Sequence, residues 1–101
     1  MEFDKLVRDN IPEIILKNGR IPIIHTADVK EFEFYLLKKL REEVDEYIEN
    51  SSEEELADVL DVIYAIYQVK GYDPEELEKK RREKLKTRGG FEKRIILDKT
   101  E

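Results

Sequence analysis

Apolar side chains recur at helical spacing along the middle of the chain, from about Val29 to Glu49. Residues three or four apart are apolar and those between them are mostly charged, and the repeating positions are Phe32, Leu36, Leu40, Val44 and Tyr47. Such spacing places one apolar stripe along an α-helix. The pattern therefore predicts a long amphipathic helix over residues 29–49.

A second helix is predicted directly after it and ends before Gly71. Its start carries two candidate capping boxes of the form S-x-x-E, Ser51 with Glu54 and Ser52 with Glu55. A glycine after the last turn suits the left-handed residue that often closes a helix. Because the connection between the two helices is short, they are expected to form an antiparallel hairpin.

Shorter helices are predicted on both sides of the hairpin. The first follows a cap at Asp9 or Asn10 and stops near the Asn-Gly pair at 18–19. The last opens at Asp73, which is followed by a proline and two acids, and stops at the glycine pair at 89–90. The fold class expected from these elements is mainly α, with flanking helices around a helical hairpin.

Two short segments resemble strands. Residues 20–28 hold three isoleucines around a proline, which suits an edge strand, and residues 93–98 read KRIILD. The two can pair as a small ribbon that joins the ends of the chain. With 101 residues and no internal repeat, the sequence predicts a single domain over 1–101.

Three acids interrupt the apolar surface of the second long helix: Glu55, Asp58 and Asp61. On a helical wheel Asp58 falls among apolar neighbours, whereas Asp61 falls toward Tyr64 and Gln68. An ionised carboxylate in an apolar setting costs several kcal/mol unless a cation or strong donors compensate it. Asp58 in particular therefore needs a partner.

The hairpin supplies acidic partners from its first helix. If the turn is centred on residues 50–51, Glu46 faces Glu55 and Glu43 faces Asp58, and the two layers are one helical turn apart. Four carboxylates then converge on a small volume. Such a group is stable only if cations neutralise it or several protons stay bound.

All-oxygen ligation of this kind favours Mg²⁺, with Mn²⁺ as the alternative. The other interpretation is a solvated acidic helix face, because E-x-x-E and E-x-x-D pairs are common in an acidic chain. The mirrored placement across the hairpin favours the metal. Asp61 has Leu40 opposite it and no acid, so it is expected to be a supporting or structural residue.

Composition narrows the class of protein. Lys and Arg number 19 against 25 Asp and Glu, a formal net charge of −6, which argues against a general nucleic-acid binder. There is no cysteine, so disulfides and thiolate metal sites are excluded. No apolar run approaches the roughly 20 residues of a membrane span, and the first residues do not resemble a signal peptide. We expect a cytoplasmic protein with no membrane contact.

Two basic pairs at helical spacing are candidates for binding phosphate. They are Lys84 with Arg88, four residues apart, and Lys5 with Arg8, three residues apart. Either pair could neutralise a polyphosphate beside a metal ion. A solvated basic face is an equally good interpretation of both from spacing alone.

The acidic motif and both ends of the chain resemble one protein family. EEVDE at 42–46 followed by ELAD at 55–58 is similar to the E-E-x-x-E and E-x-x-D signature of the all-α nucleoside triphosphate pyrophosphohydrolases. This group includes the MazG-like and phosphoribosyl-ATP pyrophosphohydrolase-like proteins. KLVRDNIPEII at 5–15 and KLKTRGGFEKRIIL at 84–97 resemble its short, single-domain branch. The stretch between the two acidic motifs is shorter than in typical MazG proteins.

The resemblance implies a site and a reaction. Glu43, Glu46, Glu55 and Asp58 would ligate Mg²⁺, with Glu42 nearby as an outer carboxylate or base. Lys84 and Arg88 resemble the basic residues that contact the phosphates. The implied reaction cleaves a nucleoside triphosphate between its α- and β-phosphates, in a protein that assembles as a homo-oligomer, either a dimer or a tetramer.

Two other functions stay open. One is specific hydrolysis of phosphoribosyl-ATP in histidine synthesis, which shares the chemistry and differs in substrate. The other is a helical module without catalytic activity that dimerises or binds a protein through its charged surface. Metal-dependent turnover distinguishes the module from both enzymes.

Overall fold

The computed structural model describes residues 4–101, which form four α-helices and no strand. The helices are α1 (Ile11–Lys17), α2 (Val29–Glu49), α3 (Glu53–Lys70) and α4 (Pro74–Arg88). Contacts divide the chain into two compact units, Met1–Gly71 and Tyr72–Glu101. The first unit contains α1 to α3 and the second contains α4. The single domain expected over 1–101 stays a prediction.

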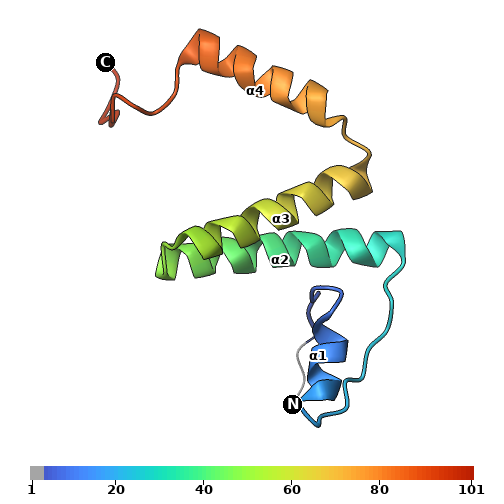
Figure 1. The fold of residues 1–101 in the computed structure, drawn as a ribbon. Helices are drawn as coiled ribbons and strands as arrows, with labels where there is room; N and C mark the ends of the chain where they lie inside the picture. The colour runs from blue at the N-terminus through green and yellow to red at the C-terminus, as the bar shows by residue number, and fades with distance from the viewer. Residues whose placement is uncertain (1–3) are drawn as a thin grey trace. The chain divides into compact units, whose positions relative to one another are not determined.

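Helices α2 and α3 pack against each other as the predicted antiparallel hairpin (Figure 1). Asp28 caps α2 by accepting a hydrogen bond from the Glu31 amide at 2.9 Å. Ser52, rather than Ser51, caps α3 by accepting from the Glu55 amide at 3.2 Å. The Ser52 amide itself donates to the Asn50 carbonyl at 2.7 Å, so Glu55 does not complete a capping box. The mainly α fold with a helical hairpin is confirmed.

The ends of the other helices follow the local chemistry. Gly71 closes α3 with a φ of 68°, the left-handed conformation that costs glycine least. Asp73 caps α4 by accepting from the Glu75 amide at 3.0 Å. Helix α1 begins after Asn10 as predicted, but the Asn10 side chain makes no capping hydrogen bond.

The predicted ribbon is wrong for the described residues, because neither 20–28 nor 93–98 forms a strand. Pro22 lacks an N–H to donate to a ladder, and a two-stranded ribbon alone is marginally stable in water. The isoleucines that suggested the strands are exposed, Ile23 to 98% and Ile96 to 80%. These apolar side chains are therefore not buried in a sheet.

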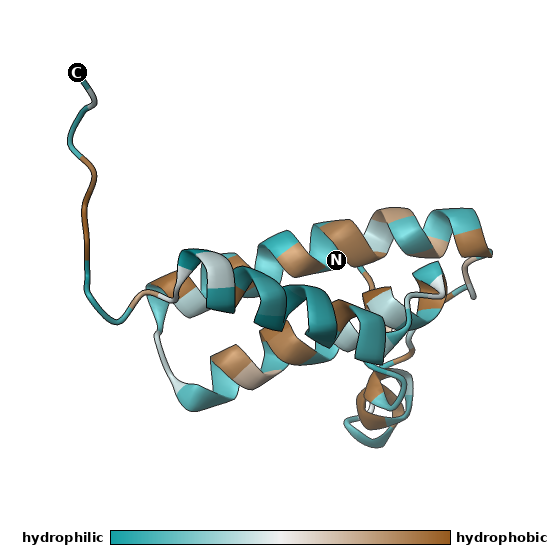
Figure 2. Ribbon diagram, turned by 90° about the horizontal axis from the view of Figure 1, so that it is seen from above, coloured by the Kyte–Doolittle hydropathy of each residue, from teal (hydrophilic) through white to brown (hydrophobic). Residues whose placement is uncertain are grey.

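The hairpin buries little of its apolar surface. Within the described residues only Leu36 and Val62 are buried apolar side chains, and the one buried charged residue is Glu43. Hydrophobic residues recur along both hairpin helices, whereas α4 is almost wholly hydrophilic (Figure 2). None of the four described helices has the length and apolar character needed to cross a bilayer.

Candidate metal centre

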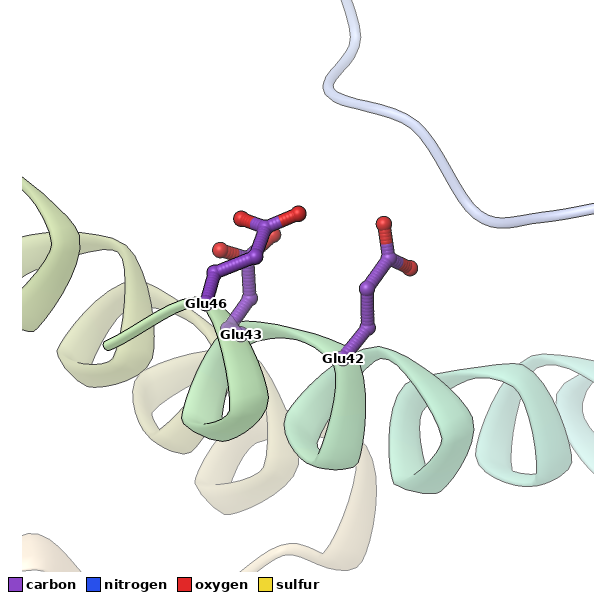
Figure 3. A group of neighbouring side chains, drawn as sticks. All are labelled: Glu42, Glu43 and Glu46. Carbon is purple, nitrogen blue, oxygen red and sulfur yellow. The ribbon is translucent and has the colours of Figure 1, made fainter. Parts of the chain in front are cut away.

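Three carboxylates from α2 gather on one side of that helix. Glu42, Glu43 and Glu46 each offer one ligand oxygen, and these oxygens lie within 4.8 Å of one another (Figure 3). Positions i, i+1 and i+4 fall on neighbouring rows of an α-helix, so regular helix geometry alone brings the side chains together.

Helix α3 adds two further acids across the hairpin. Glu43, Glu55 and Asp58 form a second group whose ligand oxygens also lie within 4.8 Å of one another. Glu43 belongs to both groups and joins them. The structure therefore brings together all four predicted ligands and Glu42, through the antiparallel pairing expected from the turn.

Two oxygens of this cluster are buried without a hydrogen-bond partner. They are Oε2 of Glu43 and Oε2 of Glu55, for which the described residues supply no donor. Only 9% of the Glu43 side chain is exposed, and its other oxygen lies 3.2 Å from Lys39 Nζ. A buried carboxylate oxygen without a donor is costly. A divalent cation ligated by oxygen would supply the missing partner, so the residues fit such an ion.

Mutual repulsion is visible in the ionisation of Glu46. The neighbouring Glu43 carboxylate raises the pKa of Glu46, first by sharing a hydrogen bond with its protonated form and then by its charge. Burial and the charges of Glu55 and Glu42 raise this pKa further. The centre therefore favours binding a positive charge, whether a proton or a metal ion.

Three basic side chains partly compensate the acids. Lys39 Nζ lies 3.6 Å from Glu42 as well as close to Glu43, and Lys5 Nζ lies 3.8 Å from Glu42. Arg8 contacts Asp58 at 2.7 Å and Asp61 at 2.8 Å. Six carboxylates against these three cations leave an excess of negative charge at the centre. An ion of charge +2 would reduce that excess.

An open groove of about 510 Å³ lies beside the centre, between the segment at 4–6 and α2. Its charged lining is mixed, with five acids, Asp4, Glu42, Asp45, Glu46 and Glu49, and four basic residues, Lys5, Lys38, Lys39 and Arg41. The groove thus joins carboxylates that suit a cation to side chains that suit an anion.

The four candidate phosphate ligands lie in different parts of the chain. Lys5 and Arg8 are paired with acids of the centre. Lys84 and Arg88 are exposed on α4 in the second unit, and their side chains make no hydrogen bond or ion pair within residues 4–101. Contact of Lys84 and Arg88 with a phosphate stays a prediction.

Sequence reasoning missed two features of the centre. Lys39 stands three and four residues before the acids it contacts, a spacing that indicates ion pairs on a helix and could have been recognised. Asp61 was expected to be supporting or structural, and the structure pairs it with Arg8, 53 residues earlier in the chain. No local pattern reports a contact across that separation.

Comparison with known proteins gives no further guide. No protein-family model, curated protein or solved structure matches the chain. The resemblance to the MazG-like group therefore depends on the sequence motifs and stays a prediction.

Proposed function

We propose that this chain is a Mg²⁺-dependent nucleoside triphosphate pyrophosphohydrolase. It would use water to cleave the bond between the α- and β-phosphates, releasing a nucleoside monophosphate and pyrophosphate. The observation that carries the proposal is the pair of buried, unpartnered oxygens of Glu43 and Glu55 inside a five-carboxylate cluster. The MazG-like motifs support the same reaction.

Glu43, Glu46, Glu55 and Asp58 are the residues that would hold the metal. Their oxygens suit Mg²⁺, and Mn²⁺ shares the preference. When bound, such an ion neutralises charge on the phosphates and lowers the pKa of a water molecule. Glu42 lies beside these ligands and lines the groove, so we assign it to accept the proton of the attacking water.

Basic residues would bind the phosphates of the substrate. Lys5 and Arg8 already lie at the centre, where each contacts an acid of the cluster. Lys84 and Arg88, one turn apart on α4, are assigned to the phosphates by the resemblance alone. A role in clearing noncanonical or surplus nucleotides, in the cytoplasm, fits this chemistry.

We also propose that the protein works as a homo-oligomer, a dimer or a tetramer. Two apolar stripes share one side of the hairpin: Leu37, Leu40, Val44 and Ile48 on α2, and Leu56, Val59, Ile63 and Ile66 on α3. Glu33 lies one turn before Leu37 and continues the stripe of α2, and Lys70 lies one turn after Ile66 and continues the stripe of α3. The side chains of Glu33 and Lys70 form an ion pair at 3.3 Å, so the two stripes lie on the same side of the hairpin. We call these eight residues the apolar side.

A second copy is the occupant that suits the apolar side. It contains no charged residue, and Leu37 is 60% and Ile48 70% exposed. Two such hairpins can pack face to face as a four-helix bundle, which buries both apolar sides at once. The acids of the centre lie at other positions of the two helices, and Arg8 comes from the segment before α1, so this packing would leave the metal centre accessible.

Turnover assays test the enzymatic proposal. Pure protein is incubated with a panel of nucleoside triphosphates and phosphoribosyl-ATP, with Mg²⁺ or with EDTA, and released pyrophosphate is measured. We expect release that requires Mg²⁺ and is reduced at least a hundredfold in Glu43→Gln. Glu54→Gln, which removes an exposed acid outside both carboxylate groups, should stay close to wild type.

The panel also distinguishes the alternatives. Release from phosphoribosyl-ATP alone would assign the narrower activity. No Mg²⁺-dependent release from any nucleotide would refute the enzymatic proposal and favour a protein-binding module.

A further inference from the structure

The guanidinium of Arg8 bridges two acids of α3. Its Nη1 donates to Asp61 Oδ2 at 2.8 Å and its Nη2 donates to Asp58 Oδ1 at 2.7 Å. These carboxylates are three residues apart and so lie one turn apart on one face of the helix. Arg8 comes from the segment before α1, so the two bonds attach that segment to the hairpin.

The two acids differ in what else they contact. Asp58 also belongs to the group with Glu43 and Glu55, and 34% of its side chain is exposed. Asp61 belongs to neither carboxylate group, and 56% of its side chain is exposed. Arg8 is therefore the contact through which Asp61 reaches the metal centre.

We propose that Asp61 is a positioning residue that holds Arg8 against the metal ligand Asp58, and that Arg8, so held, binds a phosphate group of the ligand at the carboxylate centre. This inference rests on the proposed function of that centre. It adds a role for Asp61, an acid that has no acidic counterpart across the hairpin, and it says how Arg8 is held at the edge of the centre.

The donor inventory of arginine permits this role. A guanidinium has five N–H groups in a planar fork, and the two acids use one nitrogen each. Further N–H groups stay available to phosphate oxygens, which arginine binds well. Because a free arginine loses rotamer entropy when it is fixed, an anchor that fixes it beforehand favours ligand binding.

Simple electrostatics and positioning predict opposite results when Asp61 loses its charge. Removing a negative charge near an anion site should tighten anion binding, because it removes repulsion. Removing the anchor of Arg8 should weaken binding, because the guanidinium is no longer held in place. The sign of the change therefore separates the two accounts.

Calorimetric titration of the full chain provides the test, with inorganic pyrophosphate as the probe in the presence of Mg²⁺. We expect Asp61→Asn to weaken pyrophosphate binding about tenfold and Arg8→Gln to weaken it at least as much. The double variant should bind no more weakly than Arg8→Gln alone, because Asp61 acts through Arg8. Asp61→Glu should restore most of the affinity. Glu54→Gln, on the same helix and without contact to Arg8, should bind as wild type or slightly tighter.

Arg8→Lys is the second variant, since it keeps the charge and cannot bridge two carboxylates with a rigid fork. It should lose several-fold in pyrophosphate affinity. Thermal unfolding is recorded for every variant. A lower melting temperature of Asp61→Asn with unchanged pyrophosphate affinity would show a merely structural tether and overturn the inference.

Other outcomes separate this inference from the proposed function. If the wild type binds pyrophosphate with Mg²⁺ and Asp61→Asn binds it equally well or more tightly, the inference fails and the proposed function stands. Additive losses in the double variant would also overturn it. If the wild type binds neither Mg²⁺ nor pyrophosphate, both fail together.

Discussion

Glu46 lies one helical turn from Glu43, and the two carboxylates repel each other. A hydrogen bond between protonated Glu46 and Glu43 raises the pKa of Glu46 above its ordinary 4.5, and this repulsion, burial and the charges of Glu55 and Glu42 raise it further. The folded protein then holds a proton more tightly than the unfolded chain. Stability is therefore lost as the pH rises from about 4.5 through the raised pKa, and the full cost is present above that pKa.

We predict that Glu46→Gln stabilises the protein at pH 7 in EDTA. Glutamine keeps the size of the side chain and removes the repelling charge. Because solvent screens this side chain, the gain should be small, about 0.5 kcal/mol. Thermal unfolding between pH 4 and pH 8 measures it, and the difference from wild type should shrink toward pH 4, where Glu46 is protonated in both states.

Glu54→Gln is the matched control and should show no such trend with pH. A Glu46→Gln variant less stable than wild type at pH 7 would contradict the prediction. Adding Mg²⁺ should reverse the order of stability, because the wild type keeps a ligand that the variant lacks.

At the same scale, sequence predicted the acids of the centre, but it missed Lys39 and named Lys5 and Arg8 only as candidates for binding phosphate, not as partners of these acids. The rise per residue of an α-helix is fixed, so two antiparallel helices joined by a turn near 50–51 place Glu43 and Asp58 at the same height along the hairpin. The structure brings these two residues together in one carboxylate group. Arg8 lies 50 residues before Asp58 and enters the centre from an irregular segment. Its position depends on how that segment packs, which no periodic pattern encodes.

At the scale of elements, helix ends were predictable because capping is local. Asp28, Ser52 and Asp73 each accept an amide hydrogen bond two or three residues ahead, and Gly71 supplies a left-handed residue. The two predicted strands, by contrast, are not formed in the described residues. A strand needs a neighbouring strand, and apolar residues around Pro22 say nothing about whether one is present.

The choice between Ser51 and Ser52 as cap gives a direct prediction. Ser52→Ala removes the acceptor for the Glu55 amide and should cost about 1 kcal/mol, a fall of several °C in melting temperature. Ser51 instead donates its hydroxyl to the Tyr47 carbonyl at 3.0 Å, at the end of α2. Ser51→Ala should cost less than half as much.

Thermal unfolding of the two single variants decides between the serines. Equal losses, or a larger loss for Ser51→Ala, would show that α3 is not capped as the structure indicates. Because Glu55 is both the capped residue and a candidate metal ligand, Ser52→Ala should also weaken Mg²⁺ binding slightly.

At the scale of the molecule, the hairpin separates two chemistries. The acids and Arg8 occupy one part of its surface, whereas the apolar side is without charge and ends at the Glu33–Lys70 ion pair. With only Leu36 and Val62 as buried apolar side chains among the described residues, one copy of the hairpin has a very small core. Covering the apolar side with a second copy would enlarge that core considerably.

We therefore predict that the 12.1 kDa chain forms a dimer, or a tetramer built from dimers, in solution. A stable interface buries about 800 Å² on each partner, and the apolar side offers aliphatic surface over several turns of both helices. Leu37→Glu places a charge on that side, facing apolar groups of the partner, and should shift the protein to monomer. Light scattering after size-exclusion chromatography measures the mass directly.

Leu16→Glu is the matched control, because Leu16 is similarly exposed, at 57%, but lies on α1. It should leave the mass of the oligomer unchanged. A wild-type protein that is monomeric at 100 µM would refute the prediction, as would a Leu37→Glu variant that keeps the wild-type mass. If Leu37→Glu is monomeric and also loses Mg²⁺ affinity, pairing of hairpins and order of the acidic centre are coupled. The α2–α3 packing that buries Glu43 would then depend on the second copy.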